Sequence, residues 1–501
     1  MKSCELLSKE KNLSLYSFII NILITSLTYG MFLQMHYSVD SYAIIYNNAG
    51  QQYLMQGRVI SYFLNSILNV LNFNPTLNQK VLTLSLIICI AISMTTLINI
   101  LYKLFEEKNI EKWIALHIII FISFLNVFLL EWFLYPEITL FLGIGLVSTV
   151  FGIWILSIND RIINIFIGFI LLNISMGIYQ ANLGIFIIYS LAICFIKNKG
   201  NLNRTSIVSS IKILSIGALT SIFNILILKI LVYSGIAPKS DREPNLGFEI
   251  IKNNILGIFE AQKNIWSNTY KFLPKYILII FVCTIIFITI YLLRKNKLNL
   301  KNIIYIISIV LINYLIIFVP HIFTSILWIA QRTIISFFTF ISFLCLIALF
   351  YSQNNKKTYL LLVSTSVIFL TINFISIQLI GSNHIASNKI DREFSILINN
   401  EIEKYEKEYG ITIKNIAAEC DTQPTYSYQD IKYCIYDTNV RAFVTQWANV
   451  NMISYYSNRY YNKVEMDKEI YDEHFKGRNW NDFNIDEQLI FKDDTLYLII
   501  Y

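Results

Sequence analysis

The sequence predicts a polytopic α-helical membrane protein with a small α/β domain at its C-terminus. Of 501 residues, 55% are hydrophobic and only 15% are charged, whereas ordinary soluble domains carry about 25% charged residues. Apolar runs of roughly twenty residues, long enough to cross a bilayer, recur along the chain. From about residue 382 these runs stop, and a polar tail with turn signals follows.

The apolar segments predict about eleven transmembrane helices. No small-residue cleavage site follows the first segment, so we expect a retained helix rather than a signal peptide. The fifth and sixth are short for a hydrocarbon core of ~30 Å, so they are expected to tilt or to form a hairpin that does not fully cross. The segments are 15–33, 78–102, 113–131, 137–157, 162–177, 182–196, 206–233, 275–293, 302–319, 333–351 and 359–380.

The positions of lysine and arginine predict the orientation of these helices. If the N-terminal "KEK" is cytoplasmic, the loops on that side are "YKLFEEKNIEK", "NDR", "KNKGNLNR", "RKNKLNLK" and "NNKKT". Each contains basic residues, as the positive-inside rule requires. The net charge of +7 therefore reflects topology. The basic residues form no continuous surface of the kind that would indicate binding to nucleic acid. The C-terminus is expected to be extracytoplasmic.

Four elements are then expected on the outer side. They are the 34–77 region, the "EWFLYPE" turn, the 234–274 loop and the tail. Within the first, one edge is apolar at helical spacing and the opposite edge is polar, which predicts an amphipathic helix at the membrane surface. The apolar edge holds Ile60, Phe63, Leu64, Ile67 and Leu71, and the polar edge holds Arg58, Ser61, Asn65 and Asn69.

The tail predicts a second domain, residues 382–501, after a transmembrane domain of residues 1–381. "DREFSILINNEIEKYEKEYG" is typical of an amphipathic helix that ends at Gly410. "ITIKNIAAE" predicts a strand after it, and "DDTLYLIIY" predicts a closing strand after a turn. A helix, two strands and further helical segments indicate a small α/β domain.

Cysteine and histidine spacing predicts no cofactor. Only Cys420 and Cys434 lie in the outer domain, where an oxidising compartment allows a disulfide, but their separation in space decides whether they pair. None of the five histidines has a second His or Cys at metal-ligand spacing. The chain also lacks the Walker and GxSxG motifs of ATPases and serine hydrolases.

The acids expected on the outer face are the first candidates for chemistry, because membrane proteins hide few charges in their helices. Asp40 is a candidate general base for an attacking hydroxyl; alternatively, it is a solvated loop acid or a helix cap. Glu131 and Glu137 flank "WFLYP" and are candidates to position an acceptor or assist Asp40. The alternative is that both are helix-end acids, with Glu137 favoured at a helix N-terminus.

The cations and amides on this face are candidates for substrate binding. Arg58, Arg332 and His321 are candidates to neutralise a lipid-linked phosphate, or they are interfacial cations that meet lipid headgroups. "SMGIYQANLG" places Tyr179 and Gln180 at the tip of the shortest hairpin, where a phenol and an amide can bind sugar hydroxyls. Interfacial tyrosine is common, so Gln180 is the more unusual of the two.

Several of these stretches resemble the bacterial glucosyl transferase family II, the phage-type O-antigen-modifying glucosyltransferases. The resemblance rests on the order and placement of four motifs. They are "VDSY...GQQYLMQGRVIS" after the first span, "YPEITLFLG" opening the fourth, "SMGIYQANLGIFI" at the short hairpin and "NKIDREFSILINNEI" in the tail.

This resemblance implies a GT-C-like glycosyltransferase of the bacterial inner membrane. It implies transfer of a hexose, glucose first, from a donor such as undecaprenyl-phosphate glucose to a surface polysaccharide such as lipopolysaccharide O-antigen. A donor synthase and a flippase are the implied functional partners, besides membrane lipid.

The resemblance also assigns roles to residues. It marks Asp40 as the catalytic loop acid. It also marks Arg58 in "GR" and Glu137 in "YPE" as positions that match the family's motifs, together with the "YQ" pair of Tyr179 and Gln180. It does not reach Glu131, His321 or Arg332, which rest on topology alone. The first loop has a single acid and no adjacent pair, which favours metal-free base catalysis with inversion over metal-bridged activation.

Two other functions fit a chain with this many helices. A lipid-linked sugar flippase or another transporter is expected to carry charges within its spans or an internal repeat, and the sequence has neither. A surface-polysaccharide polymerase usually has a large outer loop between spans, whereas the largest outer element here is C-terminal.

Overall fold

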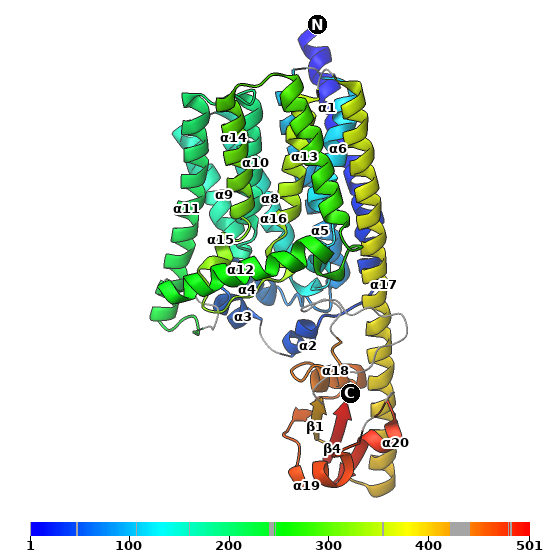
Figure 1. The fold of residues 1–501 in the computed structure, drawn as a ribbon. Coiled ribbons are helices and arrows are strands. Elements are labelled where there is room, and N and C mark those ends of the chain that lie inside the picture. Colours follow the sequence, from blue (N-terminus) through cyan, green and yellow to red (C-terminus); the bar gives the residue numbers. More distant parts are fainter. Residues whose placement is uncertain are drawn as a thin grey trace.

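The chain forms a helical bundle with a small sheet-containing unit at one end. The computed structural model describes residues 2–46, 49–106, 108–159, 161–239, 245, 247–352, 355–420, 441–478, 480 and 483–500. The N-terminus lies at one end of the bundle and the sheet lies beyond the opposite end (Figure 1). The predicted combination of a helical membrane domain and a C-terminal sheet is therefore confirmed at this level.

The long helices of the bundle follow the predicted apolar segments in order. Six helices in the described ranges are long and apolar enough to span a membrane, as expected of a membrane protein; the full set of eleven crossings stays a prediction. The bundle helices are α1 (Lys2–Tyr29), α5 (Gln79–Leu104), α6 (Ile110–Phe124), α8 (Thr139–Ile158), α9 (Ile162–Ile178), α10 (Asn182–Lys197), α11 (Arg204–Tyr233), α13 (Ile277–Lys295), α14 (Leu300–Leu315), α16 (Ser336–Tyr351) and α17 (Lys356–Tyr409).

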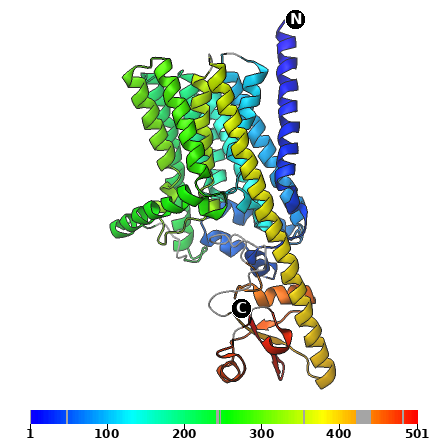
Figure 2. The same ribbon diagram turned by 45° about the vertical axis from the view of Figure 1, so that its right-hand side comes forward.

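The basic loops gather at the N-terminal end of the bundle. Lys199 Nζ lies 2.7 Å from Glu106 Oε1, and Asn302 Nδ2 donates to Asn201 Oδ1 at 2.7 Å. These contacts join two of the five loops that the charge pattern assigns to one side, and connect one of them to the start of α14, directly after a third loop. The opposite end carries the short helices and the sheet (Figures 1 and 2). The side of a membrane that each end faces stays a prediction.

The third apolar segment differs from the prediction, because α6 ends at Phe124 and does not continue to residue 131. Asn126 Oδ1 accepts hydrogen bonds from the backbone N–H groups of Phe128 and Leu129, both at 3.0 Å. Its Nδ2 donates to two carbonyls in the last turn of α6. An asparagine side chain that satisfies the backbone in this way favours a turn over a helix. The short helix α7 (Leu130–Phe133) follows.

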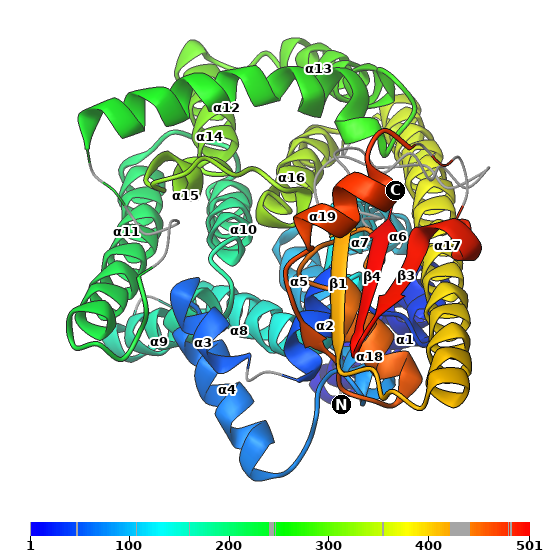
Figure 3. The ribbon, with the colours of Figure 1, turned by 90° about the horizontal axis from the view of Figure 1, so that it is seen from below.

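Besides α7, eight short helices and the longer α12 lie at the end of the bundle opposite the N-terminus in the described residues. One of them, α12, lies across the ends of the long helices (Figure 3). They are η1 (Gly30–Leu33), α2 (Val39–Ile45), α3 (Gly50–Met55), α4 (Val59–Val70), η2 (Pro136–Ile138), α12 (Phe248–Asn268), η3 (Thr269–Lys271), α15 (Val319–Ile322) and η4 (Gln331–Thr333).

The predicted amphipathic helix corresponds to α4. Its polar residues Ser61 and Asn65 are buried, and Ser61 Oγ donates to the carbonyl of Ile178 in α9 at 3.4 Å. The apolar Phe63 and Ile67 remain 60% and 43% exposed. A helix that turns its polar edge to the protein and its apolar edge outward is typical of a membrane surface.

The bundle is connected to the C-terminal sheet by one unbroken helix. α17 continues for 54 residues through the predicted domain boundary at 381 and 382. It ends where predicted, at Gly410, whose positive φ of 69° and whose N–H bond to the carbonyl of Glu406 form a left-handed C-cap. The predicted tail helix is therefore the end of a helix that begins in the bundle.

The sheet has the strand order β2-β1-β4-β3. Both predicted strands are present: β1 (Asn415–Cys420) pairs in parallel with β4 (Thr495–Ile500). We call these strands and the helices around them the C-terminal unit. Cys434 lies outside the described residues, so the disulfide with Cys420 stays a prediction. The other elements are β2 (Asn462–Lys463), β3 (Leu489–Lys492), α18 (Asn449–Ser457), α19 (Lys468–Ile470), η5 (Tyr471–Phe475) and α20 (Ile485–Gln488).

Candidate active site

Asp40 lies in the first turn of α2, at the bundle end that faces the C-terminal unit. A capping box starts this helix: Ser38 Oγ accepts from the N–H of Ser41, and Ser41 Oγ accepts from the N–H of Ser38, both at 3.0 Å. These bonds satisfy backbone donors that a helix start leaves open. The carboxyl of Asp40 is favoured at this positive helix end, and its side chain is partly exposed.

Glu137 holds the same helix start from the other side. Its Oε1 accepts from Ser38 Oγ at 3.2 Å and its Oε2 accepts from Ser41 Oγ at 2.7 Å. Glu137 lies in η2, directly before α8, and is only 2% exposed. Its carboxyl is close enough to Asp40 for the two to interact electrostatically. The structure therefore brings together two acids that the sequence could not place relative to one another.

Tyr53 lies within electrostatic reach of both acids, and it was not among the residues that the sequence indicated. It lies in α3, is buried, and packs edge-on against Phe141 with ring centroids 5.9 Å apart. Burial raises its pKa, the charges of Glu137 and Asp40 raise it further, and the charge of Arg58 opposes them. At neutral pH Tyr53 is therefore a neutral phenol beside two acids and a guanidinium. The available signal was its place in "GQQYLMQGR", five residues before Arg58.

Arg58 and Tyr179 meet beside this cluster. The guanidinium carbon of Arg58 lies 4.8 Å from the centroid of the Tyr179 ring, which is a cation–π contact. Tyr179 is buried, and Trp132 packs against it edge to face with ring centroids 5.7 Å apart. Two residues that the sequence separates by 121 positions are thus in direct contact, as a composite site requires.

Gln180 fixes the turn between α9 and α10 to the turn before α4. Its Nε2 donates to the carbonyls of Gln56 and Gly57, at 3.1 and 3.3 Å. Gly57 has a φ of +70°, and a Cβ there would lie 3.3 Å from Gln180 Nε2, so glycine suits both the turn and the close approach. These bonds hold Arg58 near Tyr179, and sugar binding by Gln180 stays a prediction.

Glu131 and Arg332 form a separate, buried ion pair. The backbone N–H of Arg332 donates to Glu131 Oε2 at 2.6 Å, and its guanidinium binds Glu131 Oε1. The guanidinium carbon also lies 4.6 Å from the ring centroids of both Tyr135 and Trp328. The pair connects α7 to η4. Because both side chains are buried, each charge depends on the other for neutralisation. Glu137, and not Glu131, binds the residues next to Asp40.

His321 is buried in α15. Burial lowers its pKa from the ordinary 6.5 to about 4, because a low-dielectric environment disfavours the charged imidazolium. At neutral pH the imidazole is therefore uncharged. A role in phosphate binding, as predicted, would depend on hydrogen bonding and not on charge.

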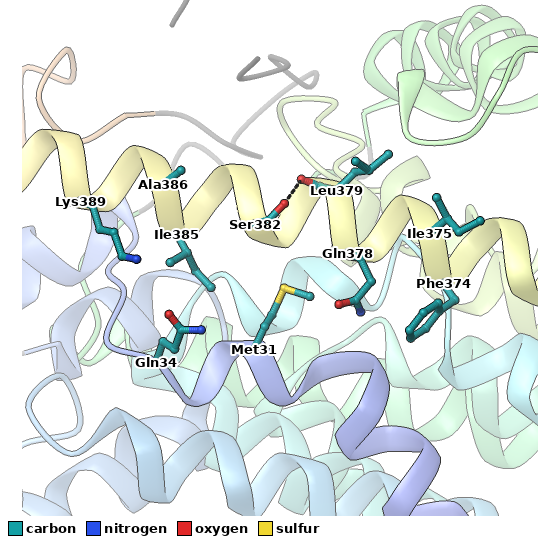
Figure 4. Close-up of a pocket in the computed structure, with 10 residues that line it drawn as sticks. All are labelled: Met31, Gln34, Phe374, Ile375, Gln378, Leu379, Ser382, Ile385, Ala386 and Lys389. Carbon is teal, nitrogen blue, oxygen red and sulfur yellow. Dashed lines mark hydrogen bonds between the residues drawn. The ribbon is translucent and has the colours of Figure 1, made fainter. Parts of the chain in front are cut away.

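A groove with a volume of about 610 Å³ lies apart from these residues. It is formed between α17 and the η1 turn, with Met31 and Gln34 on one side and Phe374, Gln378 and Lys389 on the other (Figure 4). None of the candidate residues lines it. The candidate chemistry therefore belongs to the cluster around α2 and α3.

The cluster of Asp40, Glu137, Tyr53 and Arg58 combines three chemical capacities. A partly exposed carboxylate can accept a proton, a guanidinium can bind an anion such as phosphate, and a neutral phenol can donate a hydrogen bond. Within the ranges that the structure describes, no three His, Cys, Asp or Glu side chains gather as a metal site would require.

Comparison with known proteins identifies the chain by family. Residues 29–349 match the family model described as Glucosyl transferase GtrII. This match contains every candidate residue of the bundle and ends before α17 and the C-terminal unit. No curated protein and no solved structure matches the chain.

Proposed function

The chain belongs to the glucosyl transferase GtrII family, and on this premise we propose that it moves glucose from a polyprenyl-phosphate donor to a surface polysaccharide such as lipopolysaccharide O-antigen. Family membership supports a glycosyltransferase with a sugar donor and an acceptor. The lipid-linked donor, the polysaccharide acceptor and an extracytoplasmic site on the inner membrane are our proposals. The observation that carries them is the cluster of Asp40, Tyr53 and Arg58 at the end of a bundle of membrane-like helices.

Asp40 acts as the general base in this proposal. The acceptor hydroxyl gives its proton to the Asp40 carboxylate as its oxygen forms a bond to the anomeric carbon. The bond from that carbon to the phosphate oxygen breaks, and the phosphate leaves with the electron pair. Attack from the face opposite the phosphate inverts the anomeric centre. Asp40 suits this role better than Glu137, because it is partly exposed whereas Glu137 is buried and already accepts two serine hydrogen bonds.

Arg58 binds the leaving phosphate in this scheme. Its guanidinium offers paired donors to phosphate oxygens and stabilises the charge that develops as the bond breaks. Arg58 directly precedes α4, whose exposed apolar face would lie along the lipid tail. Tyr53, near both Asp40 and Arg58, is a hydrogen-bond donor to the same region.

The remaining candidates have supporting roles. Arg332 and His321 are proposed as further phosphate contacts, and Tyr179 and Gln180 are proposed as sugar contacts. Glu131 and Glu137 would hold the elements on which these groups lie, through the Arg332 ion pair and the two serines respectively.

Transfer by purified protein tests the proposal. The full chain in lipid nanodiscs is incubated with polyprenyl-phosphate hexoses and candidate polysaccharides, and the anomeric configuration of the product is read by NMR. We expect transfer with inversion, and loss of transfer in Asp40→Asn without loss of protein. Asp472→Asn, at an exposed position in the C-terminal unit, is the matched control and should transfer normally.

Three results would overturn parts of this proposal. Full transfer by Asp40→Asn would remove the base assignment. No transfer with any donor, together with movement of lipid-linked sugar across vesicle membranes, would favour a flippase. Joining of repeat units in place of single-sugar transfer would favour a polymerase.

A further inference from the structure

Three tyrosine pairs join the segment that carries Asp40 to the C-terminal unit. The hydroxyls of Tyr37 and Tyr455 lie 2.7 Å apart, and those of Tyr42 and Tyr456 lie 2.9 Å apart. The rings of Tyr46 and Tyr460 meet edge to face with centroids 5.6 Å apart. We call these six residues the tyrosine seam; they connect positions more than 400 residues apart in sequence.

The first outer segment belongs to the hydrophobic core of the C-terminal unit. Tyr37, Val39 and Tyr42 are buried in the same cluster as Met452 and Ile453 of α18. A separate cluster forms the core of the bundle. The backbone N–H of Tyr37 also donates to Asn388 Oδ1 of α17 at 2.7 Å. The C-terminal unit therefore packs directly on the segment that carries the candidate base, and α2 lies between the bundle and α18 (Figure 1).

The two sides of α2 have different partners. Residues two and six positions after Asp40 lie about 200° and 240° around a helix from it. These residues are Tyr42, which contacts Tyr456 of α18, and Tyr46, which contacts Tyr460 just after α18. Ser41, beside Asp40, binds Glu137 in η2 instead. α2 has only seven residues, and isolated helices of that length do not hold together in water. Its orientation is therefore set by Glu137 on one side and the tyrosine seam on the other.

We propose that the C-terminal unit positions Asp40 for proton transfer through the tyrosine seam. This inference rests on the proposed function, in which Asp40 is the general base. Tyr455 and Tyr456 are then positioning residues, which touch neither substrate nor reacting atoms. Proton transfer requires the base within hydrogen-bond reach of the hydroxyl, so a small rotation of α2 slows the chemical step and leaves donor binding intact.

The test compares tyrosine-to-phenylalanine variants of the full chain in nanodiscs. The double variant Tyr455→Phe/Tyr456→Phe keeps both rings and removes both hydroxyl contacts to the segment that carries Asp40, one to Tyr37 and one to Tyr42 of α2. We expect its kcat to fall roughly five- to thirtyfold, since one lost hydrogen bond of ordinary strength corresponds to about fivefold. The KM for the polyprenyl-phosphate hexose should stay within about twofold. Tyr42→Phe, from the other side of the seam, should reproduce part of the effect.

Hydrogen exchange gives a readout that does not depend on activity. Backbone exchange in residues 37–46 should rise in the double variant, because α2 opens more often when one of its two supports is weakened. Tyr405→Phe is the matched control: Tyr405 is a tyrosine of α17 whose hydroxyl donates to the carbonyl of Asp493 at 3.4 Å, away from the seam. It should change neither kcat nor exchange in residues 37–46.

The outcomes separate this inference from the proposed function. Unchanged exchange in residues 37–46 would overturn the seam as a support of α2. Unchanged kcat in the double variant, with Asp40→Asn inactive, would overturn the positioning role alone. Full transfer by Asp40→Asn would overturn the base assignment and the positioning role together, and would reduce the seam to a structural joint.

Discussion

Glu137 Oε2 accepts a hydrogen bond from Ser41 Oγ at 2.7 Å, and by this contact η2, directly before α8, holds the first turn of α2. The acid that lies one residue before Ser41 is Asp40. A buried acid and a capping serine thus hold the helix turn that carries the candidate base.

Replacement of Glu137 should therefore lower kcat in a graded way. Glu137→Ala removes both serine contacts, and an ordinary hydrogen bond contributes about 0.5–1.5 kcal/mol. We expect a roughly tenfold to hundredfold loss for Glu137→Ala and a smaller loss for Glu137→Gln, whose amide oxygen still accepts one serine. Steady-state kinetics checks this order. A Glu137→Gln variant as inactive as Asp40→Asn would instead indicate that Glu137 is the base.

Replacement of Arg58 should weaken donor use more than catalysis. Arg58→Ala removes the guanidinium that we place on the donor phosphate, so the KM for the polyprenyl-phosphate hexose should rise by about tenfold. Arg58→Lys keeps the charge without the planar pair of donors, so its KM should lie between those of the wild type and Arg58→Ala. Arg161→Ala, in a loop at the other end of the bundle, is the control. An unaltered KM in Arg58→Ala would assign Arg58 to lipid headgroups.

The buried pair of Arg441 and Asp391 should be important for the fold of the C-terminal unit. Arg441 Nε donates to Asp391 Oδ1 at 2.8 Å, and both side chains are almost completely buried. Loss of one partner leaves a buried charge, which costs about 3–5 kcal/mol. Arg441→Ala should therefore make the C-terminal unit sensitive to limited proteolysis.

Lys404→Ala is the control for that experiment. Lys404 is exposed and pairs with Glu401 at 3.4 Å, and exposed pairs contribute little. Equal resistance of the Arg441→Ala and Lys404→Ala proteins would show that the buried pair is not needed for the fold.

His321 should make the protein less stable as the pH falls. Its pKa of about 4 in the folded protein lies below the ordinary value of 6.5, so between these values the unfolded chain binds a proton that the folded chain does not. Stability then decreases from pH 7 towards pH 4, by up to about 3 kcal/mol. His321→Gln should show a weaker decrease in Tm over this range. His474→Gln, at a more exposed histidine, should behave like the wild type. The same dependence of Tm on pH in the wild type, His321→Gln and His474→Gln would contradict the prediction.

The sequence alone determined the features that depend on short stretches of chain. Apolar runs predicted the long helices in their order, apolar residues at helical spacing predicted α4, and Gly410 predicted the end of α17. These succeed because hydrophobic periodicity and turn chemistry are local properties. The end of α6 was misplaced, because the long apolar run outweighed the single side chain of Asn126, which satisfies the backbone there.

Only the tertiary structure decided which distant side chains meet. Glu131 and Glu137 are six residues apart and looked alike in sequence, yet one binds Arg332 and the other binds the serines beside Asp40. The tyrosine seam carried no signal in the sequence, because tyrosine is common at membrane interfaces, and Tyr53 was marked only by its place five residues before Arg58. Such pairings follow from how the helices pack, which brings together side chains that are hundreds of residues apart. These contacts produce no repeating pattern in the sequence.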